Sequence, residues 1–402
     1  MSSIIKVDTI QDQAGNNIIN ESSNTITIGK ANDTVNIVGT LQNNGGSLPG
    51  DITSVVAGTG LSGGGTSGDV TLNVDAAQSG ITSLGTLTGL TVNGNVSVDG
   101  GTVKLDGNYP TGTENVALGD TALDSVEAGG SHNVAIGDKA GTAITTGDSN
   151  IAIGACAMPS NQTAANNVAI GFESLRDVST GTRNIGIGTN AIRKGTSANC
   201  NVAIGVSAMQ NALTGGDNVG VGNGALQNNN TGASNTALGA FTLDANTTAS
   251  NNTAVGICAL SANTTGTINT AVGKESLRDN TTGSRNIAIG SDTLVNNTTG
   301  LCNVAIGQGA LFTNSTSCNN NALGKSSLFY NTTGDFNTAI GSCTLVNNTT
   351  ADNNTAVGFK SLEANTTASN NVAIGCGALS ANTTGEVNTA VGTASMVTNT
   401  TG

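Results

Sequence analysis

A five-residue pattern of alternating character recurs along most of the chain. Asparagine is followed by an aliphatic residue or threonine, then alanine or glycine, an aliphatic residue and a closing glycine, as in Asn150–Gly154 and Asn252–Gly256. The closing glycines run from Gly119 to Gly392 at a constant seventeen-residue spacing, except that the first interval, from Gly119 to Gly137, is longer by one. The repeat therefore has 17 copies over residues 115–402. A strict period of this kind indicates units that stack on one another.

Each unit is predicted to form one coil of a β-solenoid. With the asparagine as position 1, positions 1, 3 and 5 face one side of a strand, and positions 2 and 4 face the other. Glycine at position 5 predicts a tight bend. The Asn-Thr-Thr-Gly of later copies predicts a second corner in which asparagine and glycine take left-handed backbone angles. At about 4.8 Å per coil the rod is roughly 80 Å long, with stacked asparagines bonded along it.

The large aliphatic residues are too few for a self-contained core. Each coil carries about two, at positions 4 and 9, with small residues at positions 3, 5 and 8. If the small residues fill the coil, positions 2 and 4 form an outward apolar stripe, which marks an interaction surface. Identical chains around a symmetry axis would bury it, although the period alone does not choose between two and three chains. A helical repeat is disfavoured, because glycine and asparagine are poor helix formers.

Composition and charge narrow the function classes. The 402 residues include 57 Gly and no Trp, with 2% aromatic and 10% charged residues, whereas ordinary domains have about 25% charged residues. A thick enzyme core is therefore not expected, and the plentiful Val, Ile and Thr argue against disorder. A net charge of −13 without a basic cluster argues against nucleic-acid binding. No apolar run reaches the ~20 residues of a membrane helix, and residues 1–10 do not resemble a secretory signal.

Candidate chemistry is sparse. The single histidine, His132, has no nucleophile placed near it by the pattern, and the seven cysteines form no CxxC or Cys/His cluster. The 26 Asp and Glu residues are enough to supply a carboxylate pair for glycoside cleavage, but the aromatic platforms usual at sugar-cleaving sites are almost absent. Gly63–Gly65 lacks the GK[ST] of a phosphate loop. We therefore predict no catalytic, cofactor or metal site, and no enzyme activity.

The aromatic residues are the candidate contact residues. Five of them lie beyond residue 310, at variable positions of the unit: Phe312, Phe329, Tyr330, Phe336 and Phe359. Phe312 and Phe329 are separated by one full period of the repeat, so we expect them to stack in one column. Two interpretations stay open, namely packing between protomers at the coil corners and a receptor-contacting patch near the distal end.

The repeated phrase resembles a known family. NVAIG and NTAVG, followed by Ala-Leu or Ser-Leu, resemble the head repeat of trimeric autotransporter adhesins (YadA-like heads) over residues 115–402. The resemblance implies a left-handed β-roll that associates as a homotrimer. The 17-residue coil is longer than that of the family, so the corners differ.

Three N-terminal segments resemble tail-fibre proteins of tailed phages, especially marine cyanophages. They are SSIIKVDTIQDQAGNNIIN at 2–20, GDITSVVAGTGLSGGG at 50–65 and ITSLGTLTGLTVNGNV at 81–96. The resemblance implies an N-terminus attached to a tail or baseplate protein, with the rest projecting toward a host receptor, a polysaccharide or outer-membrane component. Such a fibre is assembled in the host cytoplasm and needs neither a signal peptide nor a membrane anchor.

These patterns together predict an all-β chain in three parts. Residues 1–49 form a virion-attachment segment, 50–112 a Gly-rich stalk of short strands, and 113–402 seventeen β-roll-like repeats in a homotrimeric fibre. The expected function is that of a structural tail fibre. A bacterial cell-surface adhesin head and a polysaccharide-degrading tailspike stay open as alternatives. Because no atypical capping unit is visible, we also expect a longer fibre or a capping partner.

Overall fold

The computed structural model describes the repeat region and short pieces of the N-terminal part. The described residues are 9–11, 14, 17–22, 25–28, 55–56, 61–65, 71–74 and 114–402. They contain strands and turns, and no helix occurs among them. The chain divides into two units, Met1–Asp99 and Gly100–Gly402. The boundaries expected at residues 49 and 112 lie outside the described residues, so the three-part division stays a prediction.

The described strands of the first unit form two small antiparallel sheets. Their bounds are β1 (Thr9–Gln11), β2 (Asn17–Ser22), β3 (Thr25–Ile28), β4 (Val55–Val56), β5 (Leu61–Gly65) and β6 (Leu72–Val74). Strands β1, β2 and β3 pair in sequence order, as do β4, β5 and β6. The triple glycine Gly63–Gly65 lies within β5, where Gly64 and Gly65 pair with β4, so it is part of a sheet. The short strands expected in the rest of the 50–112 stalk lie outside the described residues.

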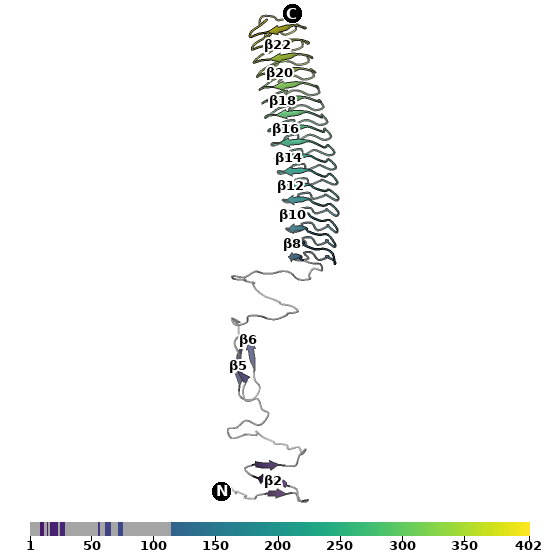
Figure 1. Cartoon of the computed structure of the whole chain (residues 1–402), viewed down its shortest axis with the longest axis vertical. Helices are drawn as coiled ribbons and strands as arrows, with labels where there is room; N and C mark the ends of the chain where they lie inside the picture. The colour runs from purple at the N-terminus through teal and green to yellow at the C-terminus, as the bar shows by residue number, and fades with distance from the viewer. Residues whose placement is uncertain are drawn as a thin grey trace. The chain divides into compact units, whose positions relative to one another are not determined.

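The repeats of the second unit form a parallel β-solenoid (Figure 1), as predicted. Each copy contributes one short strand. The strands are β7 (Val116–Leu118), β8 (Val134–Ile136), β9 (Ile151–Ile153), β10 (Val168–Ile170), β11 (Ile185–Ile187), β12 (Val202–Ile204), β13 (Val219–Val221), β14 (Thr236–Leu238), β15 (Thr253–Val255), β16 (Thr270–Val272), β17 (Ile287–Ile289), β18 (Val304–Ile306), β19 (Asn321–Leu323), β20 (Thr338–Ile340), β21 (Thr355–Val357), β22 (Val372–Ile374) and β23 (Thr389–Val391). Each strand pairs in register with the next, so Ala169 lies beside Gly186, its counterpart in the following coil. The handedness implied by the YadA resemblance stays a prediction.

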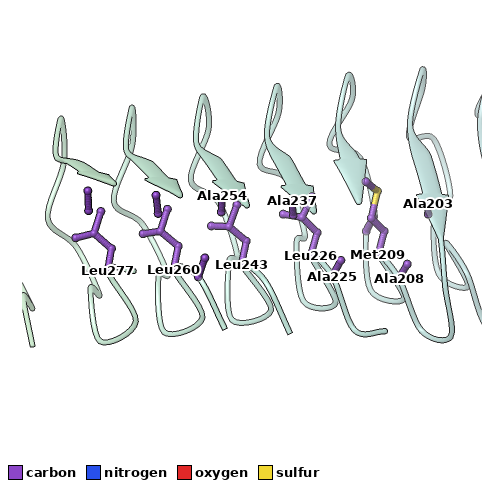
Figure 2. Packing of buried hydrophobic residues seen from close by; sticks show 14 of the residues in the cluster. Ala203, Ala208, Met209, Ala225, Leu226, Ala237, Leu243, Ala254, Leu260 and Leu277 are labelled. Carbon is purple, nitrogen blue, oxygen red and sulfur yellow. The ribbon is translucent and has the colours of Figure 1, made fainter. Parts of the chain in front are cut away.

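The interior of each coil is thin and holds small and aliphatic side chains. Alanine at position 3 and leucine at position 9 are fully buried in most coils, as Ala254 and Leu260 illustrate at 0% exposure. Figure 2 shows Leu226, Leu243 and Leu260 extending from one wall of the coil toward the alanines of the strands. The alternation predicted from the sequence is confirmed, because positions 2 and 4 of the strands are partly or fully exposed while position 3 is buried.

Two columns of buried asparagines run through the solenoid. At position 1, the Asn218 Nδ2 donates to the Asn201 Oδ1 at 3.1 Å and to the Gly232 carbonyl at 2.9 Å. At position 12, the Asn280 Nδ2 donates to the Asn263 Oδ1 at 2.8 Å. Each amide therefore joins neighbouring coils and satisfies backbone groups that lie away from water. The predicted asparagine ladder is confirmed for position 1, and position 12 adds a second one.

Glycine at position 5 is required by the bend that follows each strand. Gly222 has a φ of +136°, and a Cβ added there would lie 2.3 Å from the carbonyl oxygen of Gly239 in the next coil. A real Cβ cannot approach a backbone oxygen so closely, and L-residues rarely adopt this φ. The sequence-based expectation of a bend that excludes a side chain is confirmed.

The second corner does not have the predicted backbone. Left-handed angles occur at positions 7, 9 and 17, as at Glu275 (φ 55°), Leu277 (φ 52°) and Arg285 (φ 60°), and not at the asparagine and glycine of Asn-Thr-Thr-Gly. Asparagine at position 12 is selected by its buried hydrogen bonds. Position 15 is Gly, Ala or Ser in every copy, and space there is tight, because a Cβ on Gly266 would lie 2.2 Å from the Gly283 carbonyl oxygen unless the coils shift. The residue preference therefore reflects packing between coils rather than local backbone angle.

Candidate interaction surfaces

The outer face of the solenoid strands, which we call the strand face, carries an unbroken aliphatic row at position 4 beside Val, Ile, Thr or Asn at position 2. It consists of the side chains at positions 2 and 4 of strands β7–β23, and position 4 is Ile, Leu or Val in every copy. Leu323 and Ile340, from adjacent coils, are 44% and 40% exposed. No described residue covers this face. The outward stripe predicted from the sequence is therefore present along the full run of coils.

Three aromatic residues form a cluster at the coil edge. The rings of Phe312 and Phe329 stack with centroids 4.9 Å apart and planes 3° apart, which confirms the predicted column. Tyr330 meets Phe329 edge to face at 4.8 Å. Both arrangements are favourable for aromatic pairs. The stack leaves Tyr330 supported from one side and about half exposed.

The other two candidate residues lie elsewhere on the coil. Phe336 occupies position 17 and is 58% exposed, while Phe359 occupies position 6 and is half exposed. The ammonium of Lys360 lies 5.7 Å from the Phe359 ring centroid, within the range of a cation–π contact. The structure brings three of the five candidates together, and their role in receptor or protomer contact stays a prediction.

An open groove beside the aromatic cluster was not predicted from the sequence. It has a volume of about 450 Å³. It is lined by Thr313, Tyr330, Thr332, Asn347, Thr349, Ala364 and Thr366. These residues come from positions 11 and 13 of successive coils. Two residues in the sequence could have indicated it: Tyr330 at position 11 of one coil and the small Ala364 at position 11 two coils later.

Several of the charged residues form local ion pairs. Arg278 donates to both Asp279 and Glu275 at 2.8–2.9 Å, and the bond to Asp279 raises the pKa of the Arg278 guanidinium. A hydrogen bond from Lys274 lowers the pKa of Glu275. Such pairing keeps these groups charged and hydrogen-bonded to one another. Paired charges of this kind are typical of a protein surface and do not indicate a reactive centre.

The groups that could carry chemistry are dispersed. The Nε2 of His132 lies 2.6 Å from a carboxylate oxygen of Glu114, both exposed. The seven cysteines are all free, and burial raises the pKa of the Cys258 thiol, which makes its reactive thiolate scarcer. Over the described residues, no group of three His, Cys, Asp or Glu side chains is arranged to hold a metal ion. The same residues contain no helix that could span a membrane.

Searches of this chain against protein-family models, curated proteins and solved structures return no match. The resemblances to YadA-like heads and to phage tail fibres rest on the repeated phrase and the N-terminal segments alone. What is established is a β-solenoid repeat protein with a 17-residue period and a strand face that no described residue covers.

Proposed function

We propose that this chain is a structural phage tail fibre, a homotrimeric rod that is attached to the virion by its N-terminus and supports or carries recognition of a host receptor. The observation that carries the proposal is the strand face. The coil interior is satisfied within one chain, since its asparagines bond between coils and its leucines are buried. The exposed aliphatic row is the part of the solenoid that would be buried by association with other chains.

The strand face is large enough to drive association. Full burial of an aliphatic side chain contributes about 1.5–3 kcal/mol, so covering the exposed 40% of Ile340 contributes about 1 kcal/mol. Summed over the coils this is on the order of 10 kcal/mol per chain, comparable to the roughly 4–15 kcal/mol cost of association. A long array therefore associates where a short one would not, which suits a fibre. Three chains are favoured over two by the resemblance to YadA-like heads.

The N-terminal segments support the placement on a virion. Their likeness to tail-fibre proteins suggests assembly in the host cytoplasm, a tail or baseplate protein as the partner at the N-terminus, and a host polysaccharide or outer-membrane component as the receptor. The action is mechanical: stacked coils form a stiff spacer. The aromatic residues Phe312, Phe329, Tyr330, Phe336 and Phe359 are candidate receptor or protomer contacts.

Antibodies against residues 114–402 test the placement directly. Gold-labelled antibody should decorate fibres on phage particles, and purified protein should block adsorption to the host cell. Label confined to a bacterial outer surface would favour the adhesin head, and release of reducing sugars from host polysaccharide would favour the tailspike.

Single substitutions separate the two roles of the surface. Ile289→Asp, in the middle of the strand face, should dissociate the assembly, because it buries an unpaired carboxylate in the interface. Leu301→Asp is the matched control, since Leu301 is 43% exposed but lies at position 16, outside the strands. Equal oligomer mass for both variants and the unsubstituted chain would refute the interface. Phe336→Ala should leave melting unchanged and reduce cell binding if this ring contacts the receptor. Phe329→Ala should reduce binding in the same way, with a small loss of melting temperature because it removes two ring contacts.

A further inference from the structure

We propose that the groove beside Tyr330 binds a neutral pyranose saccharide, an inference that rests on the proposed receptor-binding function and assigns it a site and a ligand chemistry. The groove holds one of only two tyrosines in the chain, next to two of its six phenylalanines. Tyr330 is the aromatic residue that lines the groove, and Phe329 and Phe312 stack behind it.

The Tyr330 ring that lines the groove is held in place before a ligand binds. Tyr330 contacts Phe329 edge to face, and Phe329 stacks on Phe312. The Tyr330 backbone N–H donates to the Val346 carbonyl of the next coil at 3.0 Å. A ring fixed in this way loses little conformational freedom when a ligand stacks on it. The C–H face of a pyranose is apolar and flat, and it packs on such a ring.

The polar groups of the groove are left with accepting capacity. The hydroxyls of Thr332 and Thr349 each donate to the carbonyl of the equivalent residue in the next coil, at 3.0 Å, so each oxygen keeps lone pairs that can accept a hydrogen bond. The Asn347 Nδ2 donates to the Glu363 carbonyl at 2.9 Å, which leaves its Oδ1 as a further acceptor. A row of acceptors beside an apolar ring matches the hydroxyl donors along the edge of a sugar.

Shape and charge select the ligand class. Ala364 stands at position 11, where Tyr330 and Asn347 stand in the two preceding coils, and its small side chain leaves the end of the groove open. The volume of about 450 Å³ lies within the range of small-ligand sites, roughly 300–1,000 Å³. No lining residue is charged and the chain carries a net charge of −13, so an anionic glycan is disfavoured. The groove and the strand face share no residue.

A glycan array probed with the labelled full-length chain tests this assignment, with neutral and acidic oligosaccharides as the probes. The chain should bind at least one neutral oligosaccharide, and Tyr330→Ser and Ala364→Gln should each reduce that binding about tenfold or more. Tyr330→Phe, which keeps the ring, should retain more binding than Tyr330→Ser. Phe172→Ser is the matched control, because Phe172 is also half exposed but distant from the groove in sequence, and it should bind as the unsubstituted chain does.

The outcome is separable from that of the proposed function. Circular dichroism melts that coincide for all variants assign a loss of binding to the groove. Binding to no neutral oligosaccharide, or full binding by Tyr330→Ser, would overturn the inference. Inhibition of phage adsorption by the purified chain is scored independently, so a fibre that blocks adsorption without binding any glycan would retain the proposed function while refuting the saccharide site.

Discussion

The two asparagine ladders provide a sharp test of what holds the solenoid together. Asn252 and Asn263 belong to the same coil, both are 0% exposed, and both donate to the Gly266 carbonyl, at 2.9 and 3.0 Å. Replacing either with alanine removes the same atoms and creates a similar cavity. The two substitutions differ in which buried groups they leave without a partner.

At position 1 the loss is severe. The Asn252 Oδ1 accepts the backbone N–H of Asn269 at 2.9 Å, and no other described acceptor serves that buried donor. An orphaned buried N–H costs about 1–3 kcal/mol and each lost side-chain hydrogen bond about 1 kcal/mol. We therefore expect Asn252→Ala to lower the free energy of unfolding by about 3–5 kcal/mol.

At position 12 the loss is milder. The Asn280 Nδ2, which donates to the Asn263 Oδ1 at 2.8 Å, also donates to the Gly283 carbonyl at 3.0 Å, so it keeps a partner. The Gly266 carbonyl keeps its bond from Asn252. The chain itself carries a buried alanine at this position, Ala212. The substitution does leave the Asn246 Oδ1 without its donor, at 3.0 Å, but the chain already carries an unpaired amide oxygen of this ladder at Asn382. We expect Asn263→Ala to cost about 1–2 kcal/mol, mainly through the lost side-chain bonds.

Urea unfolding of the full-length chain, followed by circular dichroism, measures both values. Hydrogen exchange then checks that the weakening begins at the substituted coil and its neighbours, as expected when each repeat contacts only adjacent repeats. Equal losses for the two variants, or a loss below about 1 kcal/mol for Asn252→Ala, would refute the assignment of the position-1 ladder as the more demanding element.

Four further substitutions test the backbone and one partly buried charge. Gly222→Ala should destabilise by about 3 kcal/mol or more, since its Cβ would lie 2.3 Å from the Gly239 carbonyl oxygen. Gly377→Ala should cost only about 1–2 kcal/mol through its left-handed φ, because no atom lies within 4 Å of a Cβ added there. Similar urea midpoints for Gly222→Ala and Gly377→Ala would contradict this difference. Ser207→Gly should stabilise by about 0.5 kcal/mol, because Ser207 has a φ of 57° and glycine adopts that angle without strain; a lower midpoint would count against it. Burial raises the pKa of Asp244 above its ordinary 3.8, so its charge opposes folding at neutral pH. Asp244→Asn should therefore stabilise at pH 7, with the gain disappearing below about pH 4, and a gain independent of pH would exclude this cause.

The β-solenoid could be predicted from the sequence because it depends on patterns within and between adjacent repeats. Alternation in Ile151–Ile153 specifies which side chains point inward, and the 17-residue spacing specifies the register between coils. Glycine at position 5 follows from the bend. These features depend on one unit and the similar unit next to it, so one sequence is enough to predict them.

The features that the sequence did not predict depend on contacts between coils. Local preference favours left-handed angles at asparagine and glycine, yet Leu277 adopts one (φ 52°) because its side chain must enter the coil while its N–H donates to the Thr293 carbonyl at 2.9 Å. Packing thus overrides intrinsic preference. The groove depends on one side of Tyr330 meeting residues one and two coils later, a relation that becomes visible once the coils are stacked.

The mass of the purified full-length chain in solution, measured by light scattering after size exclusion, tests the central claim most directly. Three chains of 39.3 kDa give about 118 kDa, and we expect this mass for the unsubstituted chain at micromolar concentration. Ile289→Asp should shift it toward 39.3 kDa. A monomeric mass for the unsubstituted, folded chain would contradict the claim that the strand face is buried between three copies.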